Sequence, residues 1–199
     1  MGVVKFLNKD RHKGLGGSDS GVLMGTEYLP IHNLWCLKTQ RKKEDNLSDV
    51  LPVQMGVHTE SFNMRWFAKQ TGILTEPYPE EYVQDGFRYA HFDGWCPKEK
   101  AIIECKHTNA FTTKQKVKVR YYAQVQHYLM MSNLKTCYLS IFFGNMKWDY
   151  IKISLNEAYL DELVRRQDAF WQLVVDDQKM IFGILPEVVK IPGLSNTMH

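Results

Sequence analysis

The sequence predicts a single domain of the α/β (α+β) class. Three observations lead to this class. The apolar residues change from a helical period to a strand-like period after residue 72. Helices, strands, a further helix, further strands and a last helix then follow one another, an order typical of a mixed fold. The 199 residues suffice for one hydrophobic core. We expect this domain to span residues 1–199, with 186–199 as an extended tail.

Start and stop signals place the helices. A glycine-rich turn over 14–19 precedes a short helix over 18–24, for which Ser18 or Asp19 is the expected N-cap. Pro30 opens a second short helix, and Gly72 ends a long one. The expected helices cover 18–24, 30–37, 52–71, 113–132 and 156–176, and the charged stretch 40–51 is expected to be a surface loop.

Strand signals fill the rest of the chain. We expect a strand over 73–79, a pair over 87–93 and 101–107, and a second pair over 137–143 and 148–153. The first pair turns at the segment 97–100, and the second at Gly144 and Asn145.

Composition limits the class of protein. The net charge is only +3, so any basic surface has to be local. No apolar run reaches the ~18 residues of a membrane helix, and residues 1–13 lack the apolar stretch of a signal peptide. The cysteines are scattered, which favours neither a zinc site nor a disulfide framework and suits a reducing cytoplasm. They are Cys36, Cys96, Cys105 and Cys137.

The hairpin around Lys98 and Glu99 carries the most informative pattern. If these two residues form its centre, Asp93 lies opposite Glu104, with Cβ atoms about 4.5–5.5 Å apart. Two carboxylates that close repel each other unless a cation lies between them. Oxygen ligands suit Mg²⁺ or Mn²⁺. The pattern therefore predicts a divalent metal site.

Lys106 joins this pair through the two-residue period of a strand, which places it on the same face as Glu104. The metal can bind a phosphate oxygen, and the ammonium of Lys106 can offset the negative charge that develops. Together they favour cleavage of a phosphodiester. An Asp, then a Glu-x-Lys, is a weak pattern by itself, because Glu-x-Lys also occurs on exposed strands. Ile102 and Ile103 indicate a buried strand, in which Glu104 needs a partner.

The order of the motifs resembles the YqaJ-like viral recombinase and lambda exonuclease family of PD-(D/E)xK nucleases. The matching pieces in chain order are Arg11 with the turn 14–19, Pro30, Leu34, Trp35, Lys38, Thr39, Gly56, Glu60, Asp93, Gly94, Glu104, Cys105, Lys106 and the run 122–127. The resemblance implies a restriction-endonuclease-like core, with a central mixed sheet flanked by helices. Phe92 replaces the proline of the superfamily's name, at a position that varies widely.

The resemblance also implies roles at the metal site. Asp93, Glu104 and the backbone carbonyl of Cys105 would bind the metal, and Lys106 would be the catalytic lysine. Glu60 resembles the family's helical acid that faces the metal.

Further residues resemble functional positions of the family. Gln126 resembles the glutamine of the following helix that contacts the site, with Gln124 as the weaker candidate. Arg11 and Ser18 match the positions that hold a terminal 5′-phosphate, and glycines beside Ser18 would let a phosphate approach a helix N-terminus.

The function implied is a Mg²⁺-dependent exonuclease, with Mn²⁺ able to substitute. It would degrade the 5′-ended strand of linear duplex DNA to mononucleotides and leave 3′ overhangs for recombination by annealing. The resemblance further implies a homotrimeric ring at double-stranded DNA ends, a single-strand annealing partner, a phage origin and action in the cytoplasm of a bacterial host.

A basic run opens the helix over 113–132. It consists of Lys114, Lys116, Lys118 and Arg120. Such a run is usually a solvated face, but its place just before Gln126 would let it follow a DNA backbone. The stretch 41–43 is a weaker candidate of the same kind.

Three alternatives stay open. A PD-(D/E)xK endonuclease or resolvase would keep the fold and metal site without needing a DNA end. A catalytically inert DNA-binding module would bind DNA and not cut it. An unrelated α+β protein whose motifs match by chance would bind no metal.

Overall fold

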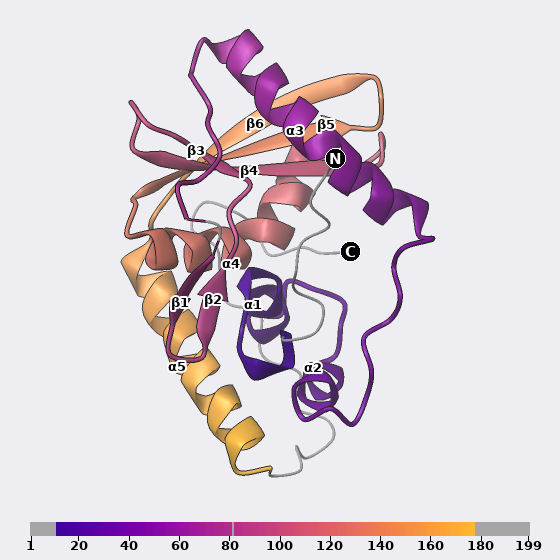
Figure 1. Ribbon diagram of the computed structural model, residues 1–199, viewed down its shortest axis with the longest axis vertical. Coiled ribbons are helices and arrows are strands. Elements are labelled where there is room, and N and C mark those ends of the chain that lie inside the picture. The colour runs from indigo at the N-terminus through magenta and orange to yellow at the C-terminus, as the bar shows by residue number, and fades with distance from the viewer. Residues whose placement is uncertain (1–10, 81, 178–199) are drawn as a thin grey trace.

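A mixed four-stranded sheet with helices on both of its faces lies in the upper half of the view in Figure 1. The structure is a computed structural model and describes residues 11–80 and 82–177, so the tail expected over 186–199 lies outside it. The strand order is β3 (Gly94–Cys96), β4 (Ala101–Thr108), β5 (Thr136–Phe143) and β6 (Lys147–Ser154). Only β4 and β5 are parallel, and the long helix α4 (Lys114–Ser132) connects them. The predicted fold class and central mixed sheet are confirmed.

The two faces of the sheet are covered by different helices. The helix α3 (Leu51–Thr71) packs on one face, where Phe67 meets Ile103 and Tyr138. Its buried Asn63 binds the backbone carbonyls of Lys106 and Ser140 at 3.2 Å each, which fixes α3 across β4 and β5.

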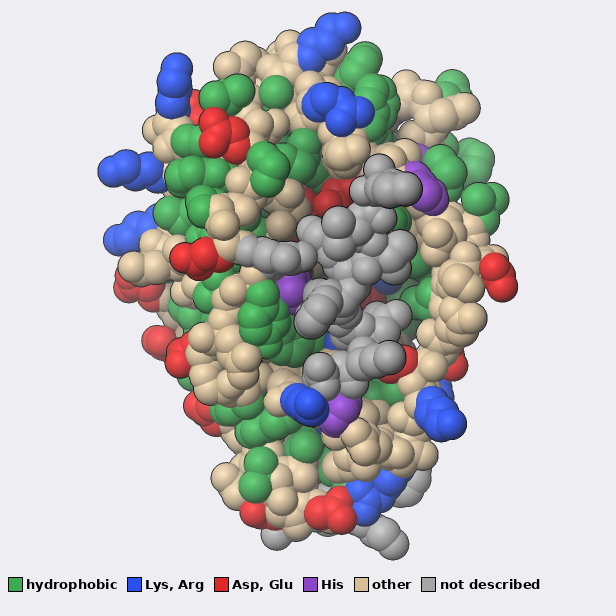
Figure 2. Space-filling view, in the orientation of Figure 1, with side chains coloured by type: hydrophobic (Ala, Val, Ile, Leu, Met, Phe, Trp, Pro, Cys, Tyr) green, Lys and Arg blue, Asp and Glu red, His purple; other side chains and the backbone are tan. Residues whose placement is uncertain are grey.

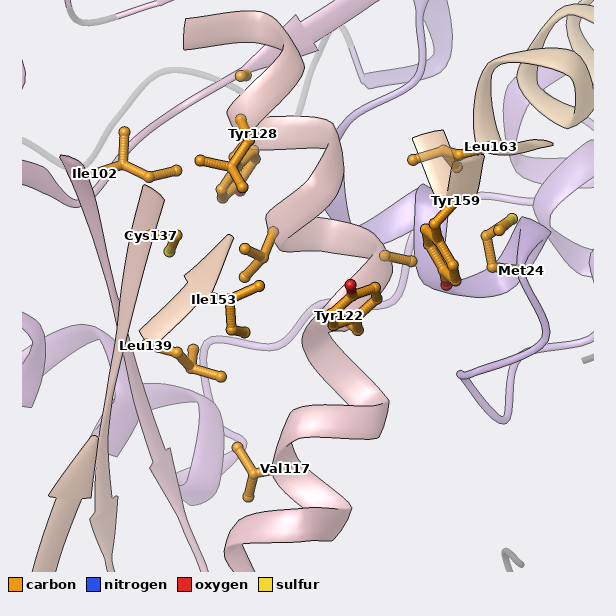
Figure 3. Packing of buried hydrophobic residues seen from close by; sticks show 14 of the residues in the cluster. Met24, Ile102, Val117, Tyr122, Tyr128, Cys137, Leu139, Ile153, Tyr159 and Leu163 are labelled. Atoms are coloured by element: carbon orange, nitrogen blue, oxygen red, sulfur yellow. The ribbon is translucent and has the colours of Figure 1, made fainter. Parts of the chain in front are cut away.

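The opposite face of the sheet packs on α4. Figure 3 shows Leu139 and Ile153 of the strands turned toward this helix. On its far side lie Tyr159 and Leu163 of α5 (Glu157–Val175) together with Met24. Since α4 is covered on both sides, all its residues from Tyr122 to Leu129 are buried.

Three short helices precede α3 in the described part of the chain. They are η1 (Arg11–Lys13), α1 (Gly17–Leu23) and α2 (Ile31–Lys38). A buried ion pair joins two of them, because Lys38 Nζ lies 2.6 Å from Asp19 Oδ2. Lys38 also donates to the carbonyl of Arg11 at 2.8 Å. The expected N-cap is wrong: Gly16 caps α1, and Asp19 instead lies in the first turn and accepts from the Gly16 N–H.

The first half of α3 projects from the body of the domain. Hydrophobic side chains gather there, toward the right edge of Figure 2. Leu51 and Val57 are more than half exposed, and the first buried residue of the helix is Asn63. The helix ends at the predicted Gly72, which adopts a left-handed conformation with φ 73°.

Two predicted strands differ from the structure. The segment 87–93 does not pair with β4: its residues Arg88–Ala90 form β2, which pairs with β1 (Val83–Asp85) in a separate two-stranded sheet. The segment 73–79 makes a single bridge, from Glu76 to Trp95, and no strand. Pro77 and Pro79 lack the N–H groups that a longer ladder needs.

The predicted register of the central hairpin is confirmed. Gly94 pairs with Ile103, Trp95 with Ile102, and Cys96 with Ala101. Continued by one residue, the same register puts Asp93 opposite Glu104.

Among the described residues, no helix combines the length and the apolar character needed to cross a membrane.

A buried polar network ties α4 to its neighbours through His127. Its Nε2 lies 2.9 Å from the carbonyl oxygen of Tyr89, and its Nδ1 lies 2.9 Å from Gln167 Nε2. Gln167 Oε1 accepts from Arg88 at 2.8 Å, so its amide group must donate to the ring. The ring is thus neutral and donates to Tyr89, and burial lowers the pKa of His127 to about 4.

This network predicts a loss of stability in acid. Because the folded protein resists protonation of His127 and the unfolded chain does not, its contribution is complete above pH 6.5 and falls as the pH drops toward 4. The loss amounts to about 3 kcal/mol at most. Urea unfolding measured from pH 7 to 4 should give a flatter profile for His127→Gln than for wild type. Parallel profiles would contradict the assignment.

Candidate functional site

The central hairpin brings Asp93 and Glu104 together, as its register requires. Asp93 Oδ2 accepts from the backbone N–H of Cys105 at 2.7 Å, across the hairpin. Glu104 lies on the face of β4 that α4 covers, and only 3% of its surface is exposed. The predicted pair of carboxylates is therefore present, with one member buried.

The carboxylate of Glu104 is only half satisfied. Its Oε1 accepts from Lys106 Nζ at 2.6 Å and from Gln124 Nε2 at 2.9 Å. Its Oε2 is buried and has no hydrogen-bond partner among the described residues. Burial, and then the charge of Asp93, raises the pKa of Glu104 to about 8, against the opposing charge of Lys106.

These features fit a divalent cation. Leaving a buried carboxylate oxygen unpaired costs free energy, and a hard cation that binds oxygen would remove both that cost and the repulsion from Asp93. Glu60 of α3 is near enough for its charge to raise the pKa values of Glu104 and Cys105 further. Within the described residues, however, no three His, Cys, Asp or Glu side chains form a metal-binding group. The roles of Glu60 and of the Cys105 carbonyl as ligands stay predictions.

Lys106 lies beside Glu104 and is the more exposed member of this ion pair. Its side chain is 20% exposed, and its Nζ lies 4.7 Å from the ring centroid of Tyr121 as well as against Glu104. Burial opposes the charge on this lysine, but the carboxylates of Glu104 and Asp93 outweigh it and raise its pKa. The ammonium is therefore charged at neutral pH.

Gln126 does not contact the acidic pair, contrary to expectation. Its Nε2 donates to the carbonyl of Ser154 at 2.9 Å, and its Oε1 accepts from the N–H of Asn156 at 2.8 Å. Gln124, the weaker candidate, reaches Glu104 instead. Two residues correspond to about 200° around a helix, so only one of the two glutamines can face the site.

Arg11 and Ser18 lie in contact, with Arg11 Nη2 donating to Ser18 Oγ at 3.2 Å. Ser18 is exposed and Arg11 half-buried. The backbone N–H of Gly16 is not open to an anion, because the Asp19 carboxylate accepts from it at 2.9 Å. A bound phosphate would therefore meet side chains at this place, rather than the helix terminus that the glycines had indicated.

Tyr89 is a member of this group that sequence reasoning missed. Its side chain hydrogen-bonds to Arg11, and burial together with the charge of Asp19 raises its pKa to about 12. Its ring lies so close to Gly16 that an added Cβ there would be 2.8 Å from a ring carbon. No sequence signal singled it out, because its contacts cross more than seventy residues of chain.

The basic run on α4 is largely at the surface. Lys114 pairs with Asp149 at 2.8 Å, and Arg120 pairs with Glu27 at 3.1 Å. Lys116 is exposed and Lys118 half-buried. Exposed ion pairs of this kind contribute little to stability and could be exchanged for phosphate contacts, so DNA binding by the run stays a prediction.

The family follows from comparison with known sequences. The profile of the YqaJ-like viral recombinase domain matches residues 7–135, about two thirds of the chain. The chain belongs to this family. The uncharacterized protein YqaJ of Bacillus subtilis (strain 168) is 28% identical to this YqaJ-like domain over 178 residues. That match covers 81% of the present chain and 53% of the relative, so the chain spans about half the length of that relative.

Solved structures share the fold of this YqaJ-like domain. The alkaline exonuclease LHK-Exo from Laribacter hongkongensis aligns with a TM-score of 0.67 and 17% identity, over 85% of this chain and 91% of that one. A phage related exonuclease from Haemophilus somnus 129PT aligns with a TM-score of 0.63 and 14% identity, over 86% and 99% of the two chains.

We expect a divalent metal bound at Asp93 and Glu104 to stabilise the folded protein. Saturating Mg²⁺ or Mn²⁺ should raise the melting temperature of the wild-type protein by roughly 5 °C, because the ion relieves the repulsion between Asp93 and Glu104 in the folded state alone. Thermal melting with and without metal measures the shift. The double variant Asp93→Asn, Glu104→Gln should lose it, while Glu99→Gln, an exposed change in the same hairpin, should keep it. A shift that survives in the double variant would place the ion elsewhere.

The two glutamines predict opposite effects. Gln124→Met should weaken metal binding by about tenfold or more, because Glu104 loses a donor that orients it. Gln126→Met should leave the metal affinity unchanged and lower the free energy of unfolding by about 2 kcal/mol, because the Ser154 carbonyl and the Asn156 N–H both lose their bond to this buried side chain. Calorimetric titration and urea unfolding separate the two. The reverse pattern would restore Gln126 as the glutamine of the site.

Proposed function

We propose that this YqaJ-like domain is a metal-dependent DNA exonuclease that removes nucleotides from the 5′-ended strand of linear duplex DNA. One observation carries the proposal: a buried carboxylate with an unpaired oxygen lies beside a second carboxylate, and a lysine is bonded to its other oxygen. The buried carboxylate is that of Glu104, and Asp93 and Lys106 are the other two groups.

The proposed cofactor is Mg²⁺, for which Mn²⁺ can substitute. Asp93, Glu104 and the carbonyl of Cys105 would hold it, with Glu60 as a further acid near the site. When bound, the ion supplies a Lewis acid for the phosphate and lowers the pKa of a water molecule.

The side chains around the ion have separate tasks. The ammonium of Lys106 offsets the charge that develops on the phosphate and orients the attacking water. Gln124 keeps Glu104 in one orientation through its 2.9 Å hydrogen bond. Both groups are fixed before the substrate arrives, so little reorganisation is needed during the reaction.

Arg11 and Ser18 are the proposed site for the terminal 5′-phosphate. A guanidinium can bind two oxygens at once, and a terminal phosphate offers more charge and more free oxygens than a diester. The nearby carboxylate of Asp19 is neutralised by Lys38 at 2.6 Å, which lessens repulsion of an incoming anion. Each cleavage would leave a new 5′-phosphate to occupy this site.

The basic run of α4 is the proposed contact with the DNA backbone, and it consists of Lys114, Lys116, Lys118 and Arg120. The wider setting is proposed on the family alone. We infer a homotrimeric ring around the duplex and 3′ overhangs passed to a single-strand annealing protein. A phage origin and action in a bacterial cytoplasm belong to the same inference.

The exonuclease proposal predicts a specific substrate preference. In Mg²⁺, linear duplex DNA with a 5′-phosphate should be degraded to mononucleotides from the 5′ end, while a covalently closed circle survives. Linear DNA with a 5′-hydroxyl should be degraded at least about tenfold more slowly, because the charge-assisted contacts with Arg11 are weaker. End-labelled substrates resolved on denaturing gels measure all three rates.

Matched variants control this experiment. Glu104→Gln should be inactive and Glu99→Gln fully active. Arg11→Gln should remove most of the preference for a 5′-phosphate, whereas Arg165→Gln, a change on the exposed side of α5, should keep it. Cutting of the circle would indicate an endonuclease or resolvase. Binding of DNA without any cleavage in Mg²⁺ or Mn²⁺ would indicate an inert binding module.

A further inference from the structure

We infer that Tyr121 is a positioning residue whose aromatic ring holds the Lys106 ammonium in place beside Glu104. The inference rests on the proposed nuclease function and adds a residue to its site. The Nζ of Lys106 lies 4.7 Å from the centroid of the Tyr121 ring and 2.6 Å from Glu104 Oε1. The ammonium is therefore held by two groups, one a carboxylate and the other a ring face.

A lysine at this position needs more than one support. Its side chain has four rotatable bonds and loses about 2 kcal/mol of conformational entropy when it is fixed. The hydrogen bond to Glu104 fixes the nitrogen on one side only. The negative face of an aromatic ring attracts the ammonium electrostatically from another side. This attraction does not use up an N–H group in a conventional hydrogen bond. Donor capacity then remains for a phosphate oxygen or a water molecule.

The place of Tyr121 on α4 matches this task. It precedes Gln124 by three residues, so both side chains lie on the same face of the helix. Gln124 binds Glu104, and Tyr121 lies against Lys106. One helical face thus supports both members of the ion pair. The adjacent Tyr122 turns into the core instead, where its ring lies 4.9 Å from that of Tyr159.

Arg120 has a second, independent anchor. Its guanidinium lies 5.4 Å from the Tyr121 ring, but its Nε also donates to Glu27 at 3.1 Å. Loss of the ring should therefore disturb Lys106 more than Arg120. Since Lys106 is assigned to the chemical step and Arg120 to the DNA backbone, the loss should appear in kcat rather than in KM.

The test compares variants that keep the ring with variants that remove it. Tyr121→Phe should degrade 5′-phosphorylated linear duplex at close to the wild-type rate. Tyr121→Leu and Tyr121→Met should each lower kcat by about tenfold with KM nearly unchanged, as expected for a cation–π contact in a partly desolvated site. Two ring-free variants are used so that a folding defect in one, visible as a large drop in melting temperature, does not decide the outcome.

Three outcomes separate the inference from the proposed function. Full kcat in both ring-free variants, with wild type active, overturns the role of Tyr121 and leaves the nuclease intact. A loss in Tyr121→Phe equal to that in Tyr121→Leu also overturns it, because the hydroxyl would then be the group that matters. An inactive wild-type protein removes the nuclease function, and the inference with it.

Discussion

A carboxylate buried beside another carboxylate is the constraint around which this domain is arranged. Glu104 lies in an interior strand of the sheet, directly after the buried Ile102 and Ile103, where an ionised group is costly. Each contact on Oε1 reduces that cost, yet Oε2 has no partner among the described residues. If stability of the fold were the only requirement, an apolar residue would be favoured at this position. A strongly perturbed acid with a specific charged neighbour is typical of functional sites, and this imbalance is the reason for proposing a cation here.

The crossover helix α4 both connects the parallel strands β4 and β5 and supports the buried acid. Parallel strands such as β4 and β5 require a long connection, and here that connection lies directly over the buried acid. One face of α4 supplies Tyr121 and Gln124 to the ion pair. Gln126, on the opposite side from Gln124, binds the end of β6, and His127 binds β2 and α5. The orientation of the site side chains therefore depends on how firmly the rest of the same helix is bound.

Local patterns predicted more of the site than of the strand order. The hairpin register, the facing carboxylates and Lys106 depend only on a two-residue period around a short turn, so the sequence determined them. The choice between Gln124 and Gln126 depends on which side of α4 faces the acids. That could not be predicted, because α4 is buried on both sides and its apolar pattern marks neither. The pairing of β2 with β1 was missed for a similar reason: any extended segment before Gly94 could have been the partner of β4.

The strand β2 connects the two parts of the proposed site. Tyr89 on this strand hydrogen-bonds to Arg11, and Asp93 follows four residues later. An extended chain of that length spans at most about 13 Å, so the place of β2 limits how far the terminal-phosphate group can lie from the acidic pair. His127 fixes the carbonyl of Tyr89, and Gln167 fixes both His127 and Arg88. The spacing between the two groups thus depends on a buried polar network that is distinct from the proposed metal ligands. If the proposed function holds, one phosphate lies at Arg11 and another at Glu104, and their separation has to be kept constant. Polar residues in the core would then serve that spacing, although apolar ones would pack there at less cost.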